Sequence, residues 1–399
     1  SGAVYKVSNT DTVGSITGAG FINLESDQTL STGSTASTFS GTMRGAGSFE
    51  KVGAATLTLS GVNNYTGTTT ITGGTLTLAD NAANILPDQS AIILKNTAGV
   101  ILNINGKSAE TIGTLSGGGA NGGNITLGDG NLTINNRANT IYSGVISGSG
   151  SVTKIGSTTL TLEGVNTYTG TTTINAGKIK VGVDSALPST AVTLSSIGQL
   201  TIENGFSQTI GNLTSASANS KVNLVGSGAL TVTQTSDTTF AGVMTGRGNL
   251  IKTGANSLTL SNNNTHAGDI TISAGTLTVI GTLSDGTDVV VNGGVYDVDA
   301  NDTVASISGL GGSINIASEV TLTDKGNSKT YAGAIAGDGT FRHVSGNLTL
   351  SGTNTVANVT ITGGTVDVTG TLADTAAVSV SSGAVYKVSN TDTVGSITG

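Results

Sequence analysis

The chain has 399 residues, of which 61 are Gly and 10% are charged, and it carries a formal net charge of −8. Nucleic acids and anionic membranes need clustered Lys and Arg, so this acidic balance disfavours both as partners. With no Cys and no run of 18 apolar residues, the sequence excludes disulfides, thiolate metal sites and direct insertion of this segment into a membrane as a helix.

Short alternating runs occur along the whole chain. Thr, Ser or Asn alternates with Leu, Ile or Val, as in TLTL at 56–59, and Gly interrupts the runs. A period of two is typical of half-buried strands, whereas no apolar stripe with helical spacing is present. Because hydrophobic residues make up 36% and aromatic residues only 3%, we expect a narrow core of small aliphatic side chains. The sequence therefore predicts an all-β protein and favours a β-helix over a sandwich.

Internal repeats indicate how these strands are organised. Four related segments each open with an aromatic residue, a small residue and Gly: Phe39-Ser40-Gly41, Tyr142-Ser143-Gly144, Phe240-Ala241-Gly242 and Tyr331-Ala332-Gly333. Their starts, at 39, 142, 240 and 331, are 103, 98 and 91 residues apart, which corresponds to about five solenoid coils of roughly 20 residues each. We predict one continuous, elongated β-solenoid through residues 1–399 without a domain boundary, with repeat units at 1–99, 100–198, 199–294 and 295–384.

A larger repeat encloses these units. Residues 1–18 read SGAVYKVSNTDTVGSITG, and residues 382–399 are identical, an offset of 381 residues. Since the inner copies have diverged, we interpret the second occurrence as the start of the next identical cell of a tandem array. An accidental or engineered duplication is the alternative. Neither end shows a polar, Pro-marked or helical cap, so we expect an uncapped rod, on the order of 95 Å for about 20 coils, that continues into further repeats.

Two long stretches resemble the autotransporter-associated β-strand repeat. They are GAGSFEKVGAATLTLSGVNNYTGTTTITGGTL at 45–76 and GSGSVTKIGSTTLTLEGVNTYTGTTTINAGKI at 148–179. The resemblance implies a right-handed parallel β-helix that forms a passenger segment of a large adhesin. It also implies an extracellular location, attached to the outer membrane or cell surface of a Gram-negative bacterium.

Two apolar positions shared by the four copies are expected to face the core. They are Phe39, Tyr142, Phe240 and Tyr331, and then Phe49, Val152, Leu250 and Phe341. The aromatic residues of the first set recur about five coils apart, on the order of 24 Å, so they cannot form one platform for stacking on sugars. A third position varies: Tyr65 and Tyr168 are replaced by His266 in the third copy and by Val356 in the fourth, which is one residue shorter.

A cation follows the second apolar set by two residues in every copy. It is Lys51, Lys154, Lys252 or His343. A regular strand would place it on the same inward face, and an unpaired buried Lys is costly. We therefore predict a bulge or corner that turns this side chain outward. A cationic stripe that binds anionic glycans is the functional alternative, disfavoured by the sparse charges.

Two further repeated positions are predicted to lie in turns. The first is an Asn, which tolerates left-handed backbone and bonds its own backbone: Asn63, Asn166, Asn264 and Asn354. The second is a pair of small residues expected at a tight corner: Gly73-Gly74, Ala176-Gly177, Ala274-Gly275 and Gly363-Gly364.

The sequence predicts no catalytic, cofactor-binding or metal site. Polysaccharide cleavage on a β-helix needs two acids near one bond, or a His base beside a nucleophile. His266 and His343 lie in different units and share no acidic neighbour in the sequence. The densest acidic group is Asp297, Asp299 and Asp302. It is not repeated in the first unit, so we interpret it as solvated charge, with a surface calcium site as the alternative.

The leading functional hypothesis is a non-enzymatic, extracellular β-solenoid that forms the stalk or passenger segment of a large tandem-repeat surface adhesin. The alternative is a subunit of an extracellular filament, sheath or surface layer whose role is assembly itself, and a polysaccharide-cleaving enzyme is a distant third. Expected partners are another copy of the chain, end to end or laterally, and the surface of a host or neighbouring cell. No cofactor is expected.

Overall fold

The computed structural model describes residues 3–79, 84–107 and 109–399. Every regular element in these residues is a β-strand and none is a helix, which confirms the all-β prediction. The chain divides into two compact units, Ser1–Thr201 and Ile202–Gly399. The predicted bounds of the four repeat units, and their continuity without a domain boundary, stay predictions.

The strands of the first unit are short, mostly of three or four residues. They are β1 (Val4–Val7), β2 (Asp11–Val13), β3 (Phe21–Leu24), β4 (Thr29–Thr32), β5 (Ser37–Phe39), β6 (Thr42–Gly45), β7 (Ser48–Lys51), β8 (Leu57–Leu59), β9 (Thr69–Ile71), β10 (Thr75–Leu78), β11 (Ile92–Leu94), β12 (Ile101–Asn103), β13 (Glu110–Ile112), β14 (Leu115–Gly117), β15 (Asn124–Thr126), β16 (Leu132–Asn135), β17 (Thr140–Tyr142), β18 (Ile146–Ser147), β19 (Val152–Ile155), β20 (Thr159–Leu162), β21 (Thr172–Ile174), β22 (Lys178–Val181), β23 (Val192–Leu194) and β24 (Gln199–Ile202).

The second unit has strands of the same kind. They are β25 (Ser207–Ile210), β26 (Leu213–Thr214), β27 (Lys221–Leu224), β28 (Ala229–Thr233), β29 (Thr238–Phe240), β30 (Val243–Gly246), β31 (Asn249–Thr253), β32 (Ser257–Leu260), β33 (Ile270–Ile272), β34 (Thr276–Val279), β35 (Asp288–Val291), β36 (Val295–Val298), β37 (Asp302–Val304), β38 (Ser306–Ser308), β39 (Ser313–Ile316), β40 (Thr321–Asp324), β41 (Lys329–Tyr331), β42 (Ala334–Ala336), β43 (Thr340–His343), β44 (Asn347–Leu350), β45 (Asn358–Ile361), β46 (Thr365–Val368), β47 (Ala377–Val380), β48 (Val385–Val388) and β49 (Ser396–Thr398).

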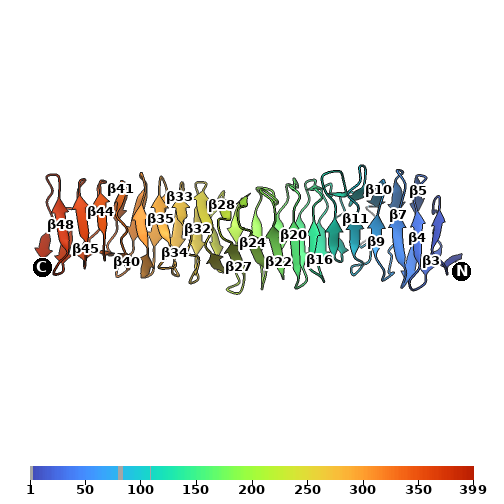
Figure 1. Cartoon of the computed structure of the whole chain (residues 1–399), viewed down its shortest axis with the longest axis horizontal. Coiled ribbons are helices and arrows are strands. Elements are labelled where there is room, and N and C mark those ends of the chain that lie inside the picture. The colour runs from blue at the N-terminus through green and yellow to red at the C-terminus, as the bar shows by residue number, and fades with distance from the viewer. Residues whose placement is uncertain (1–2, 80–83, 108) are drawn as a thin grey trace. The chain divides into compact units, whose positions relative to one another are not determined.

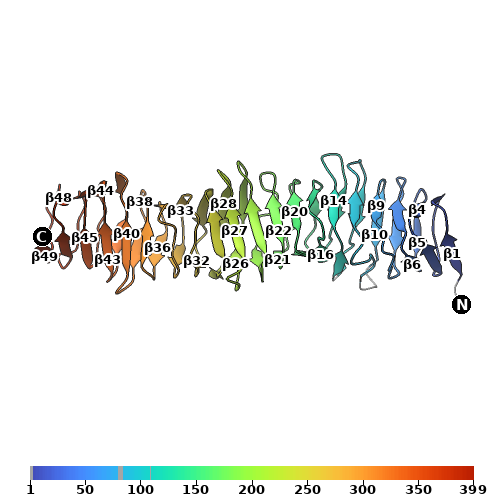
Figure 2. The same cartoon turned by 60° about the horizontal axis from the view of Figure 1, so that its bottom comes forward.

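Pairing between these strands is parallel and follows one rule in both units. Each strand pairs with one that lies two or three places later in the chain, as in the order β18-β15-β12-β10-β8-β5 of the first unit and β29-β32-β34-β36-β39-β42 of the second. The chain therefore returns to the same face once per coil, and within each unit successive coils lie side by side (Figures 1 and 2). This connectivity confirms the predicted parallel β-solenoid, which winds through about 20 turns.

The core of each unit is a narrow column of aliphatic side chains. Strand β10, TLTL, shows the basis: its two Leu side chains are fully buried while its two Thr side chains are half-buried on the outer face. Alternation with a period of two places one side chain in two inside, and parallel stacking aligns it with its equivalent in the next coil. The two apolar sets predicted for the core are buried in all four copies, from Phe39 at 3% exposure to Phe341 at 0%.

The Gly that follows each aromatic residue by two positions has a steric cause. A Cβ on Gly41 would lie 1.9 Å from the Gly20 carbonyl oxygen and 2.6 Å from the Phe39 ring. The same crowding recurs at Gly144 against Tyr142 and at Gly242 against Phe240. The aromatic ring folds back against its own chain on one side and a main-chain carbonyl of the preceding coil lies on the other, and together they exclude any residue with a side chain.

The paired small residues form corners, as predicted. Their second members have positive φ: Gly74 at 61°, Gly177 at 65°, Gly275 at 64° and Gly364 at 69°. A Cβ strains this left-handed conformation, which explains why the second residue is Gly in every copy while the first is Gly or Ala.

Candidate functional site

The repeated lysines are buried, and the prediction that they turn outward is wrong. Lys51, Lys154 and Lys252 have no exposed surface, and the strands that carry them keep their regular alternation of buried and half-buried residues. No bulge intervenes, so the side chain points inward as the residue two positions earlier does. Its stem packs closely: a Cβ on Gly33 would lie 2.5 Å from Lys51 Cδ.

Each buried ammonium group donates to three backbone carbonyl groups at a coil corner. Lys51 Nζ lies 2.7 Å from the carbonyl oxygen of Val52, 2.9 Å from that of Gly53 and 2.8 Å from that of Gly73 in the next coil. Lys154 and Lys252 make the equivalent three bonds. An ammonium has three donors, so this cage satisfies all of them and offsets the cost of burial. Burial nevertheless lowers the pKa of each of these three lysines to about 8.

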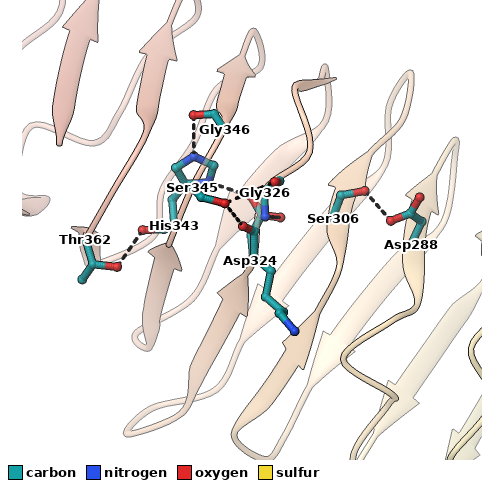
Figure 3. Close-up of polar contacts among 9 residues, drawn as sticks. Asp288, Ser306, Asp324, Gly326, His343, Ser345, Gly346 and Thr362 are labelled. Carbon is teal, nitrogen blue, oxygen red and sulfur yellow. Dashed lines mark hydrogen bonds and ion pairs between the residues drawn. The ribbon is translucent and has the colours of Figure 1, made fainter. Parts of the chain in front are cut away.

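The fourth copy replaces the lysine with a buried histidine and adds an acid. His343 Nδ1 lies 2.7 Å from Asp324 Oδ2, and its Nε2 lies 3.3 Å from the Gly346 carbonyl oxygen (Figure 3). Both ring nitrogens face acceptors, an arrangement that suits an imidazolium paired with a carboxylate. Asp324 occupies, one coil earlier, the register position that Thr32, Ile134 and Val232 occupy next to the lysines. The fourth copy therefore differs from the others at two paired positions: His replaces Lys, and Asp replaces the Thr, Ile or Val beside it.

This His–Asp pair does not form the relay of a hydrolase. Ser345 donates at 2.5 Å to the carbonyl of Lys325, and Thr362 donates at 3.2 Å to the main-chain carbonyl of His343, so both hydroxyls bond main-chain carbonyls (Figure 3). His343 is fully buried and both of its nitrogens are bonded, so it has no free base nitrogen to offer a nucleophile. The pair of Ser306 and Asp288, 2.7 Å apart, is separate from it in the same view.

The repeated asparagines bridge three consecutive coils. Asn63 Oδ1 accepts the backbone N–H of Met43, 20 residues earlier, at 2.8 Å, and its Nδ2 donates to the carbonyl of Ile85, 22 residues later, at 2.8 Å. The predicted bond to nearby backbone is present as well, from Nδ2 to the Gly61 carbonyl. The expected left-handed backbone is not: none of the four asparagines is among the described residues with positive φ.

The same bridge is present in the other copies. Asn166, Asn264 and Asn354 accept the backbone N–H of Ile146, Met244 and Ile335, and donate to the carbonyls of Ala186, Thr282 and Thr371. These buried amides add to main-chain bonds at the same place, such as those of Asn63 N–H to Ile85 at 3.1 Å and of Asn64 N–H to Met43 at 2.9 Å, and thereby help to hold neighbouring coils in register.

A further repeated position holds an acidic or amide side chain once in every unit, and the sequence analysis missed it. Its members open the related sequences DTV, ETI, QTI, DTV and DTV at Asp11, Glu110, Gln208, Asp302 and Asp392. Glu110 accepts the backbone N–H groups of Ile85 and Leu86 at 3.0 and 2.7 Å, and burial raises its pKa to about 7. Recurrence of the short motif near every 95 residues was the available signal.

The acidic group near residue 300 is divided between inside and outside. Asp302 is 3% exposed and accepts the N–H of Leu283 at 3.0 Å and the hydroxyl of Tyr296 at 2.8 Å, so the interpretation as solvated charge is wrong for it. Burial raises the pKa of its carboxyl group. Asp299 is exposed, and Asp297 on the outer face of β36 accepts from Asn315. Within the described ranges no group of three or more His, Cys, Asp or Glu side chains could hold a metal ion.

The position that varies between Tyr, His and Val is also internal. Tyr65 and Tyr168 are buried and bond the hydroxyls of Thr69 and Thr172 at 2.6 and 2.7 Å. His266 is likewise buried; its Nε2 bonds the Gly248 carbonyl, its Nδ1 has no partner, and burial lowers its pKa. The two histidines of the chain therefore serve separate packing positions.

No helix long and apolar enough to cross a membrane occurs in the part of the chain that the structure describes.

Comparison with known proteins identifies the repeat. Residues 49–78, 152–181, 250–279 and 345–368 match the passenger-associated-transport-repeat family. These four matches confirm the predicted resemblance to autotransporter passenger repeats, over less than half of the chain. The first three matches contain the caged lysine, whereas the fourth begins after His343.

The chain is also similar to one curated protein. It is 36% identical over 226 residues to the adhesin BmaC autotransporter of Brucella suis biovar 1 (strain 1330). The match covers 52% of this chain and 6% of that protein, so the chain spans a small part of the relative's length. No solved structure matches the chain.

Proposed function

We propose that this chain is a stalk segment of a secreted bacterial surface adhesin, and that it acts as a spacer rather than as an enzyme. The observation that carries the proposal is the four-fold recurrence of passenger repeats in a solenoid whose repeated Asn side chains, and repeated Lys or His side chains, are buried in every copy. Residues that bind ligands usually face solvent, whereas the repeated Lys and Asn side chains bond one coil to the next.

Location at the surface of a Gram-negative cell is part of the same proposal. It is supported by the autotransporter passenger repeats and by the similarity to an adhesin autotransporter. A filament or sheath subunit is the second candidate, because residues 1–18 and 382–399 are identical and a tandem array of 381-residue cells could equally build a continuous fibre.

The test is an in-frame deletion of this segment from the native protein, with surface labelling of intact cells and a count of cells that adhere to a host or neighbouring-cell layer. The stalk proposal expects the shortened protein still to reach the surface, with reduced adherence. Unchanged adherence together with correct surface display would contradict it. Wild-type cells that bind no antibody against residues 1–399 unless they are permeabilised would contradict the location.

A further inference from the structure

A ladder of identical residues runs along one outer face of the first unit. Five consecutive coils place a threonine at the same outward position, on strands β13, β16, β19, β21 and β23, and each pairs in register with the next: Thr111, Thr133, Thr153, Thr173 and Thr193. Every one of them is half-buried, while the residues directly before and after it are buried. The ladder therefore lies on the outer face of a regular parallel sheet, which we call the threonine face.

The threonine face is neutral. None of the side chains that its five described strands turn outward is charged; besides the threonines they are Asn135 and Ile155. The two charged residues of these strands, Glu110 and Lys154, are buried inside the coil. By contrast, Arg342 interrupts an outward column of the second unit. In a chain with a net charge of −8, a neutral face allows two copies to approach with little repulsion.

The side chains of the threonine face are suited to packing against another sheet. Thr is branched at Cβ and stiff, so fixing it in a contact costs little entropy. Polar groups beside the ladder are already bonded: Ser151 Oγ accepts the N–H of Thr171 at 3.1 Å, and Asn131 Oδ1 accepts the N–H of Ser151 at 3.1 Å. Covering them therefore leaves few unpaired groups. Parallel strands that stack identical small side chains in register form dry, interdigitated contacts between paired sheets.

The two rims of the threonine face carry opposite charges. Asp129 lies at the corner where the chain enters β16, and Arg137 lies at the corner where it leaves. Both residues are exposed, and Arg137 also donates to Gln89 Oε1 at 2.9 Å. A twofold axis parallel to the solenoid axis reverses the direction of the strands. It therefore brings the Asp129 rim of one copy beside the Arg137 rim of the other.

We propose that the threonine face binds the threonine face of a second copy of this chain, with the two solenoids side by side and parallel. The contact is isologous: the ladders pack against each other, and Asp129 of each copy lies beside Arg137 of the other. Four steps between five coils make the face about 19 Å long, and a strand of four residues makes it about 13 Å wide. Stable complexes bury about 800 Å² per partner, so this smaller contact is weak and reversible.

The inference rests on the proposed function only for the place where the pairing acts. Stalks rooted in one cell surface project in the same direction, as the parallel arrangement requires. Their common anchorage supplies the high effective concentration that a weak contact needs. Parallel pairing then joins neighbouring stalks along their sides.

Sedimentation velocity of the 399-residue chain over a range of concentrations tests the pairing. The wild-type chain should show a monomer–dimer equilibrium. Thr153→Lys sets two ammonium groups against each other at the centre of the contact, so dimerisation should weaken at least tenfold. The control is Thr58→Lys, which adds the same charge at a half-buried outward threonine of β8 and should leave dimerisation unchanged. A wild-type chain that stays monomeric up to its solubility limit, or equal effects of the two variants, would overturn the proposal.

An exchange of the rim charges tests the parallel arrangement. Asp129→Arg and Arg137→Asp each place like charges side by side and should weaken dimerisation roughly fivefold. The double variant restores opposite charges and should recover dimerisation. Both residues are exposed, so all three variants should unfold in urea close to the wild-type midpoint. A folded double variant that dimerises no better than the single variants would contradict the proposed arrangement.

The two proposals can fail separately. If the chain remains monomeric but deletion of the segment reduces adherence of cells, the pairing of threonine faces is wrong and the stalk stands. If the chain pairs through this face but deletion leaves adherence unchanged, the stalk is wrong and the filament is favoured.

Discussion

A lysine inside a solenoid whose coils have only two or three strands is stabilised by the carbonyl groups that gather where its strand ends at a corner. The ammonium group lies where the chain leaves its strand, so two carbonyls of its own coil and one of the next converge on it. Hydrogen bonds to a charged donor are each worth more than neutral ones, and three of them compete with the cost of desolvation. Where His replaces Lys, the shorter and flatter side chain is bonded by one carboxylate and one carbonyl.

Removal of one caged ammonium should be costly. Lys252→Met keeps the apolar stem but leaves three inward carbonyls without their donor, each bonded at 3.0 Å in the native protein. We expect a loss of about 2–3 kcal/mol in the free energy of unfolding, measured in urea. The control is Lys221→Ala, an exposed lysine of the same unit, which should change stability by less than about 0.5 kcal/mol. Equal effects would contradict the cage.

The caged lysines also predict a pH dependence. Burial lowers the pKa of Lys51, Lys154 and Lys252 to about 8 from an ordinary value of 10.5, so above about pH 8 the folded state binds fewer protons than the unfolded state. Stability should therefore rise as the pH increases from about 8 to about 9.5. Urea midpoints across this range check the sign, and Lys252→Met should reduce the slope. A fall in stability would mean that the carbonyls hold the proton more strongly than burial expels it.

The coordinated change in the fourth copy predicts a strong coupling. Asp324→Val alone leaves His343 without its carboxylate and should cost about 3 kcal/mol. The double variant Asp324→Val with His343→Lys recreates the pair found in the third copy, Val232 beside Lys252, and should recover most of that loss. A double-mutant cycle of unfolding free energies measures the coupling. Additive effects would show that the two positions are independent.

Single elements of this fold are too short to be stable alone, so the connections between coils matter as much as the strands. Strands of three or four residues make few ladder bonds. Between the end of β8 at Leu59 and the start of β9 at Thr69 the chain forms no strand. There Asn63 connects the coil before it to the coil after it, and Glu110 holds the N–H groups at Ile85 and Leu86. Strands and buried polar side chains together keep the coils in register.

This role can be tested with two adjacent asparagines. Asn264 is buried and bonds Met244 N–H at 2.9 Å, whereas Asn263 is exposed. Asn264→Ala should cost about 2–3 kcal/mol and speed hydrogen exchange of the Met244 amide, because a buried donor loses its acceptor. Asn263→Ala should do neither. An unchanged exchange rate of the Met244 amide in Asn264→Ala would contradict the bridging role of Asn264.

For the whole molecule, the sequence predicted the architecture more reliably than the polar interior. Alternation and the repeats define the parallel solenoid. The glycine after each aromatic residue is explained by the nearby ring together with a carbonyl of the preceding coil, as at Gly41. The inward direction of the Lys51 side chain could not be predicted from the sequence. The cost of burying its ammonium group was judged without the carbonyls that a coil corner provides. The role of the repeated acidic position was not predicted either, since Glu110 finds its partners 24 and 25 residues away in a neighbouring coil.

As a stalk, the repeated solenoid would project from the cell surface. Electron microscopy of the native full-length protein, on cells and after shearing, tests it most directly. We expect thin rods rooted at the cell surface whose length increases with the number of repeats. Compact particles would contradict it, and continuous fibres or a lattice with the axial period of one 381-residue cell would replace the stalk with a structural filament.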